Sequence, residues 1–141
     1  MQLKEIEDFV RDNSELDLDL EVASRKLSKL QSDVILMKVN EQSIYRSLLL
    51  KLDELSTDKW KHYSGKHTAE HYKKNPFDLK LLRQDVDKFI DADSDVQSLK
   101  SKISMQELKI ELLDDFLKSL NQRSYQIRSI IDVQKIQKGL I

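Results

Sequence analysis

The chain has 141 residues, of which 35% are charged and only 6% aromatic, with two glycines, one proline and no cysteine. This composition is typical of long helices in one domain, and it excludes disulfides and thiolate metal sites. The lack of cysteine favours the cytosol. The acidic first residues and the short apolar runs predict neither a secretory signal nor a membrane span.

The net charge of −1 is unevenly distributed along the chain. Residues 1–56 and residues 75–115 each carry a net charge of −4. Residues 57–74 carry +3 and residues 116–141 carry +4. Because local charge governs the attraction of phosphate more than total charge does, both basic zones are candidates for nucleic-acid binding.

The first half of the chain predicts one short and one long helix. The short amphipathic helix is indicated by Leu3, Ile6, Phe9 and Val10, and the polar stretch "RDNSELD" ends it. Apolar residues then occupy seven of nine positions at alternating spacings of three and four from residue 27 to residue 55, the pattern of a coiled-coil seam. The predicted helix is about 70 Å long. It runs from about Leu18 to Tyr63, with Asp17 or Asp19 as its cap and Gly65 just past its end.

The second half predicts another short helix and another long one. The stretch "NPFD" places Asn75 as a cap and Pro76 in the first turn of the short helix. Leu79, Leu82, Val86, Phe89 and Ile90 would line one of its faces. The stretch "DADSD" at residues 91–95 favours a break over a kink in one continuous helix. A second seam follows from Val96, with nine apolar residues at thirteen positions, and this helix should end near Gly139.

The expected fold is therefore all-α, with two long amphipathic helices and short helices packed as in a coiled coil. We expect one domain with an N-terminal arm over residues 1–65, a basic connector over residues 66–75 and a C-terminal part over residues 76–141. Two long helices do not cover such wide apolar stripes alone, which predicts self-association into a homo-oligomer. The residues assigned to this contact are Leu99, Ile103, Ile110, Leu113, Leu117, Leu120, Ile127 and Ile131.

All three histidines lie in the stretch "WKHYSGKHTAEHYKK", residues 60–74. His67 and His71 have the spacing of two zinc ligands on one helical face. A tetrahedral zinc site needs a third or fourth ligand, and no such residue can be named, so we expect neither a metal nor a cofactor. The sequence also lacks a phosphate-binding glycine loop and a nucleophile with its base, so we do not expect an enzyme.

The same stretch alternates cations with aromatic rings, a combination suited to single-stranded nucleic acid. Lysines neutralise phosphates, and aromatic faces stack on unpaired bases without reading sequence. The residues assigned to this contact are Lys59, Trp60, Lys61, His62, Tyr63, Lys66, Lys73 and Lys74, with Arg123 and Arg128 in the second basic zone. Alternatively, Trp60 and Tyr63 are core anchors, the lysines are solvated, and the C-terminal cations stabilise a helix end.

Three stretches carry a resemblance to a known family. They are "HYSGK" (62–66), "NPFDLKLLRQDVDKFIDADSDV" (75–96) and "NQRSYQIRSIIDVQKIQKG" (121–139). In this order and spacing the chain resembles the UvsY family of recombination mediators from T-even-type bacteriophages. The family's DNA-binding stretch, a basic run leading into "YYSG", maps onto residues 55–66. Lys59 and Lys66 match its basic positions, Thr57 stands in place of a lysine, and Lys61 replaces an acid.

The resemblance implies a protein that binds single-stranded DNA in recombination, replication and repair. It implies three partners besides DNA: a RecA-like recombinase of the UvsX type, the phage single-strand-binding protein, and further copies of the chain in a ring of six or seven subunits. It also implies action in the cytoplasm of the infected host, with no membrane. The main alternative is a structural or adaptor coiled-coil protein without affinity for nucleic acid.

Overall fold

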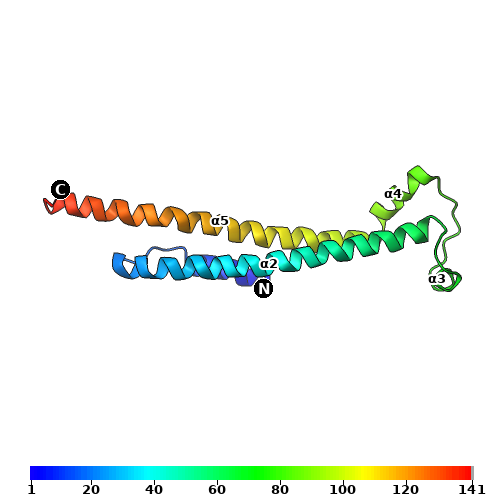
Figure 1. Ribbon diagram of the computed structural model, residues 1–141, viewed down its shortest axis with the longest axis horizontal. Helices are drawn as coiled ribbons and strands as arrows, with labels where there is room; N and C mark the ends of the chain where they lie inside the picture. Colours follow the sequence, from blue (N-terminus) through cyan, green and yellow to red (C-terminus); the bar gives the residue numbers. More distant parts are fainter. Residues whose placement is uncertain (141) are drawn as a thin grey trace. The chain divides into compact units, whose positions relative to one another are not determined.

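The structure, a computed structural model, describes residues 1–140 and contains five α-helices in that range (Figure 1). They are α1 (Leu3–Asp12), α2 (Leu20–Tyr63), α3 (Ala69–Lys74), α4 (Arg83–Ala92) and α5 (Ser94–Gln137). No strand occurs in residues 1–140, so the all-α prediction is confirmed. None of these helices is both long and apolar enough to cross a membrane. The chain forms two compact units, Met1–Ser43 with the chain from Glu107 onward, and Ile44–Gln106.

The long helices begin and end at the residues that local chemistry predicts. The carboxylate of Asp19 caps α2 by accepting hydrogen bonds of 3.0 and 3.4 Å from amides of its first turn. The helix ends before Gly65, whose φ of +76° lies in the left-handed region, and the Lys66 amide donates to the Lys61 carbonyl at 2.9 Å. This is a Schellman ending, and α5 ends in the same way before Gly139.

The core of the first unit lies where α1 packs against α2 and α5 (Figure 1). Ile6 of α1 is fully buried, and the ring of Phe9 lies 6.1 Å from that of Phe116 on α5. The short helix predicted around these residues is confirmed. It covers part of the apolar stripe that the two long helices present, which is why the first unit is a three-helix arrangement.

The residues that the sequence assigned to self-association lie largely inside the chain itself. Leu113, Leu120 and Ile127 are buried in the core of the first unit, where Leu117 and Ile131 pack against them. Ile103 is buried, and the remaining two, Leu99 and Ile110, are half-buried. A contact between subunits therefore has to be sought on other side chains.

The second unit has its own core, formed by Val86, Ile90 and Val96. Leu52 and Leu55 of α2 pack against them. Beside this core three rings from α2, the 75–82 segment and α4 meet in one aromatic cluster, with centroids 5.1 to 6.2 Å apart: Tyr63, Phe77 and Phe89. Tilted and edge-on contacts at these distances contribute about 0.5–1.5 kcal/mol per pair beyond the burial of area.

The predicted helix start at "NPFD" is wrong. Asn75 ends α3, its amide donating to the His71 carbonyl at 2.9 Å, and α4 begins only at Arg83. A residue before proline is disfavoured in the helical region, which stops α3 at this point. Leu79 and Leu82 are consequently exposed and do not line a helix face.

Asp93 separates α4 from α5, so the predicted break at residues 91–95 is confirmed. One carboxylate oxygen accepts hydrogen bonds from the first-turn amides of α5, at 2.9 Å from Asp95 and 3.2 Å from Val96. The other accepts from the Tyr63 hydroxyl at 2.6 Å and lies 3.3 Å from the Lys59 ammonium. A single buried side chain thus caps one long helix and holds the end of the other.

Replacing Asp93 with alanine should destabilise the second unit by about 2–4 kcal/mol, because the first turn of α5 loses its cap, the Tyr63 hydroxyl loses its acceptor and Lys59 loses one of its two carboxylate partners. Asp95→Ala is the matched control: its exposed carboxylate also lies near Lys59, but the expected loss is under about 1 kcal/mol. Urea unfolding followed by the fluorescence of Trp60, which lies in this unit, measures both. Equal losses would contradict a central role for Asp93.

Candidate nucleic-acid interface

Eight of the ten residues assigned to nucleic acid lie in the second unit, around the end of α2 and on α3. Four of their lysines are exposed and form no ion pair with any residue in the range 1–140: Lys61, Lys66, Lys73 and Lys74. Trp60 is 42% exposed, and the Lys66 ammonium lies 4.8 Å from the centroid of its ring. Lys66 therefore provides a free cation beside an accessible aromatic face, and the other three lysines are free cations of the same unit. This combination suits unpaired nucleic acid.

Lys59 has a different environment from the other lysines. Its side chain is 18% exposed, and its ammonium lies 2.9 Å from Asp95 and 3.3 Å from Asp93. Burial acts to lower the pKa of Lys59, but hydrogen bonds to the two carboxylates outweigh it and raise the pKa above the ordinary value. The charge of Lys59 is thus neutralised within the fold.

Tyr63 belongs to the core rather than to the surface. Its ring joins the aromatic cluster with Phe77 and Phe89, and its hydroxyl donates to Asp93. Burial, and then the nearby carboxylate of Asp93, raise the pKa of Tyr63 to about 12. Of the two alternatives for these aromatic residues, the core anchor therefore applies to Tyr63. Trp60 is exposed and stays a candidate for contact with nucleic acid.

The three histidines converge, although the sequence placed a helix end between them. Nδ1 of His62 and Nε2 of His71 are 2.8 Å apart, and the ring of His67 stacks on His71 with centroids 3.6 Å apart. The Thr68 amide donates to Nδ1 of His67 at 2.9 Å, so Nε2 of His67 carries the hydrogen that it donates to Asp58 at 2.8 Å. This hydrogen bond is the main reason that the pKa of Asp58 is lowered.

These rings hold α3 against the end of α2 through contacts with one another. Within residues 1–140 no group of three or more ligand-type side chains is arranged to hold a metal. The single hydrogen of the Tyr72 hydroxyl is shared between the His62 carbonyl at 2.8 Å and the Lys61 carbonyl at 3.0 Å. Tyr72 thereby satisfies carbonyls at the end of α2, and α3, which carries Lys73 and Lys74, is held at that end.

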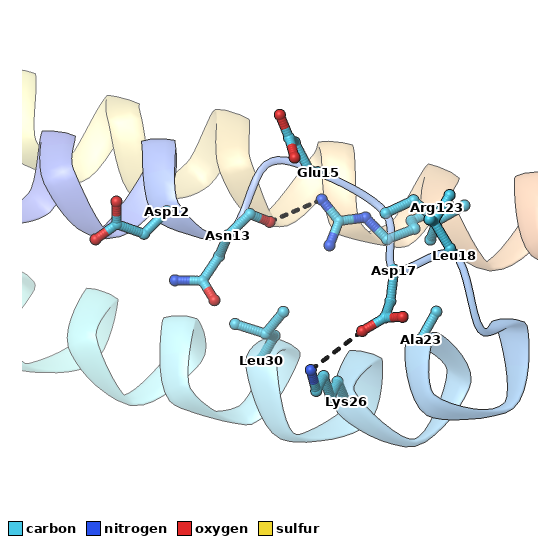
Figure 2. Close-up of a pocket in the computed structure, with 10 residues that line it drawn as sticks. Asp12, Asn13, Glu15, Asp17, Leu18, Ala23, Lys26, Leu30 and Arg123 are labelled. Atoms are coloured by element: carbon cyan, nitrogen blue, oxygen red, sulfur yellow. Dashed lines mark hydrogen bonds and ion pairs between the residues drawn. The ribbon is translucent and has the colours of Figure 1, made fainter.

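The second basic zone lies in the first unit, and its two assigned residues differ. Arg128 is exposed, whereas Arg123 is only 7% exposed. Figure 2 shows Arg123 reaching from α5 to the turn between α1 and α2, where one of its nitrogens donates to the Asn13 carbonyl at 3.0 Å and the Ser14 carbonyl at 3.1 Å. Burial lowers the pKa of Arg123.

The cleft beside Arg123 has a volume of about 420 Å³, and carboxylates line it together with two cations (Figure 2). Asp12, Glu15 and Asp17 are the acids, and Lys26 is already paired with Asp17. Three acids repel phosphate, so Arg123 is better explained as a clamp on the α1–α2 turn than as a contact for DNA.

Arg83 is a cation of the second unit that sequence reasoning missed. It lines one cleft with Trp60 and Lys66, and it forms no ion pair within residues 1–140. A signal was present, because Arg83 lies three residues before Val86 and so shares a helical face with a predicted core residue. Because the sequence predicted that this helix starts at Pro76, it did not reveal that Arg83 is the first residue of α4.

The comparisons with known proteins agree with this fold. A family model described as "Recombination, repair and ssDNA binding protein UvsY" matches residues 7–140. The chain belongs to the UvsY family. The description of the UvsY family assigns the chain in general terms to recombination and repair.

Two crystal structures of the bacteriophage T4 recombination mediator protein UvsY are similar to the chain. The lattice type II structure has a TM-score of 0.87 at 14% identity and covers 99% of both chains. The lattice type IV structure has a TM-score of 0.81 at 14% identity and covers 97% of this chain and 99% of the other. At this identity the likeness shows a shared UvsY fold. No curated protein matches the sequence.

Lys59 and Lys61 form a matched pair of tests in this UvsY-family chain, because one is ion-paired and the other is exposed and unpaired. Lys59→Gln should destabilise the second unit by about 1.5–3 kcal/mol through loss of charged hydrogen bonds, with little change in DNA affinity. Lys61→Gln should weaken DNA binding and leave stability within about 0.5 kcal/mol. Urea unfolding measures the stability of both variants, and DNA titration measures their affinity. A larger loss of affinity from Lys59→Gln would return Lys59 to the interface.

The histidine cluster predicts that acid destabilises the second unit. The pKa of His62 is lowered first by burial and then by the charges of His71 and Lys59, so the folded state favours the neutral ring. The unfolded chain binds this proton near an ordinary pKa of about 6.5. The stability that neutral His62 contributes to the second unit is therefore fully present above that pH. It is lost as the pH drops toward the lowered pKa of the folded state.

Urea unfolding at several pH values between 5 and 8, followed by Trp60 fluorescence, measures this dependence. The variant His62→Gln removes the titrating group, so its stability should vary less over the same range than that of the parent chain. An unchanged pH dependence in His62→Gln would assign the effect to other groups.

Proposed function

We propose that the chain is a recombination mediator that binds single-stranded DNA and promotes loading of a RecA-like recombinase onto strand covered by single-strand-binding protein. The observation that carries the proposal is a group of exposed, unpaired lysines in the same unit as an accessible tryptophan, with Lys66 against its ring, in a member of the UvsY family. The recombinase and the single-strand-binding protein are proposed as partners on the family resemblance alone. The place of action follows from the substrate, as the cytoplasm of the infected bacterial host.

The DNA contact is proposed for Lys61, Lys66, Lys73 and Lys74 with Trp60. Lysine ammonium groups attract the backbone of any sequence, and an exposed indole accepts any base. Both properties favour a sequence-tolerant contact with single strands, because the bases of a duplex are already stacked on one another. We propose a structural role for Lys59, since its charge is neutralised by two carboxylates.

We propose that several copies of the chain assemble into a ring of six or seven subunits, so that one strand contacts several weak sites. Linked weak sites bind together with high avidity because each bound site raises the effective concentration of the next. The residues that support a contact between subunits are exposed apolar side chains near the end of α5: Ile130, Val133 and Ile136. A shallow cleft of about 390 Å³ lies beside the first two.

The proposal is tested by titrating labelled oligo-dT and a duplex of equal length at about 50 and 200 mM salt, with anisotropy as the readout. We expect a preference for the single strand and weaker binding at the higher salt. Sedimentation with and without oligo-dT reports the number of subunits in the assembly and the number of strands bound to it. Binding that is insensitive to salt, or absent, would instead support the adaptor coiled-coil alternative.

Two triple variants compare the basic zones at equal loss of charge. Replacing Lys66, Lys73 and Lys74 with glutamine should reduce the slope of log affinity against log salt by about 2, since each phosphate contact of a single strand contributes about 0.7. Replacing Arg128, Lys135 and Lys138 removes the same charge from the other zone and should have a smaller effect. A larger effect from the second triple would move the DNA contact to the end of α5.

A further inference from the structure

The second unit contains a cleft of about 350 Å³ that joins the end of α2 to the start of α4. Its lining comes from two stretches that are separate in the sequence, 60–66 and 81–86: Trp60, Ser64, Lys66, Leu81, Arg83 and Val86. The cleft therefore exists only because the chain folds back after Gly65 and brings Arg83 beside the last turn of α2. Its volume is of the order that one nucleotide unit occupies.

The indole of Trp60 is an exposed aromatic surface without an aromatic neighbour. The ring of Tyr63, one turn further along α2, contacts Phe77 and Phe89, whereas Trp60 contacts no other ring within residues 1–140. The ring instead contacts the Lys66 ammonium, which lies 4.8 Å from its centroid. A large apolar ring at the surface beside an exposed cation is a platform for a second flat ring.

The charges around this platform favour an anion. Lys66 and Arg83 are free of ion pairs within residues 1–140, and no carboxylate belongs to the lining of the cleft. The nearby cleft beside Lys61 contrasts with it, because Asp53, Glu54 and Asp58 line that surface. Phosphate is therefore attracted more strongly to the Trp60 cleft than to the surface beside Lys61, where these carboxylates offset part of the charge of that lysine.

We propose that the cleft between Trp60 and Arg83 is a nucleotide subsite, in which the indole stacks on one unpaired base while Lys66 and Arg83 bind the adjoining phosphates. This inference rests on the proposed function and deepens it. The base takes the place of the Lys66 ammonium over the indole, and the released ammonium moves to a phosphate. The planar guanidinium of Arg83 binds phosphate oxygens in pairs, as a lysine does not.

The lining also explains why the subsite does not select a base. Leu81 and Val86 offer apolar contact without hydrogen bonds, and the Ser64 hydroxyl already donates to the Trp60 carbonyl. With Lys66 and Arg83 bound to phosphates, no unoccupied donor of the lining remains to read the edge of a base. Stacking on a platform of this kind accepts any of the four bases.

The test uses the full chain and exploits the fact that Trp60 is its one tryptophan. Oligo-dT is compared with an oligomer of equal length that carries abasic sites in place of thymidines. Anisotropy of a label on the DNA reports binding, and quenching of Trp60 fluorescence reports stacking. We expect oligo-dT to quench the fluorescence, and the abasic oligomer to leave it largely unchanged and to bind about 5- to 150-fold more weakly per stacked base.

Variants separate the indole from the phosphate contacts. Trp60→Leu keeps an apolar side chain, and oligo-dT and the abasic oligomer should then bind equally well. Arg83→Gln should weaken binding of both oligomers more than Lys88→Gln does. Lys88 is the matched control, because it is an exposed cation of α4 outside the cleft. Far-ultraviolet circular dichroism confirms that each variant retains its helices.

The outcomes distinguish failure of the subsite from failure of the proposed function. If anisotropy shows binding while Trp60 fluorescence and the abasic comparison do not respond, the subsite is wrong and single-strand binding stands. If oligo-dT does not bind, the proposed function fails. Free thymidine monophosphate forms a further arm: quenching at the same concentration as oligo-dT would assign the cleft to a free nucleotide instead of a strand.

Discussion

The buried carboxylate of Asp93 is the interaction on which the second unit depends. It caps α5, accepts from Tyr63 and draws in Lys59, so the end of one long helix and the start of the other share one acceptor. Burial acts to raise the pKa of Asp93, but hydrogen bonds from Tyr63 and Val96, together with Lys59, keep it below the ordinary value. The ionised carboxylate of Asp93 is the form that accepts hydrogen bonds from Tyr63 and from the first turn of α5 and pairs with Lys59.

This constraint also decides which side chains remain free for a ligand. On the last turns of α2, Lys59 and Tyr63 point to Asp93 and are occupied by the fold. Trp60 and Lys61 lie between them in the sequence and face elsewhere, because successive residues of a helix differ by about 100° in direction. Gly65 then turns the chain, and the contact between His62 and His71 returns α3 to the same end of α2. Structural and candidate binding residues therefore alternate along one short segment.

Much of the fold follows from the sequence, because its long helices rest on periodic apolar residues and on strong local signals. Asp19, Gly65 and Gly139 act within a few residues of their own position, and the structure uses each as expected. The start at "NPFD" failed for the opposite reason. Asn75 and Pro76 are compatible with a helix start, but Phe77 packs against Tyr63 and Phe89, and this tertiary contact outweighs the local signal.

The candidate site was predictable as a region but not residue by residue. Composition identified residues 57–74 as basic and aromatic, and that needs no knowledge of contacts. The ion pairs of Lys59 and the clamp formed by Arg123 depend on residues 34 or more positions away, which no local pattern reveals. The convergence of the three histidines was hidden for a similar reason, since a helix of only six residues carries His71.

The division of the chain into two units affects the entropy cost of folding the first unit. The second unit, Ile44–Gln106, is one uninterrupted segment, whereas the first joins Met1–Ser43 to the chain beyond Glu107. Every contact between those two parts of the first unit closes a loop through the whole of the second. Loop closure costs entropy that grows with the length of flexible chain, so an ordered second unit reduces the cost of assembling the first. The second unit, which carries the candidate DNA contact, therefore also connects the two parts of the first unit. Once it is folded, forming the three-helix core costs less entropy.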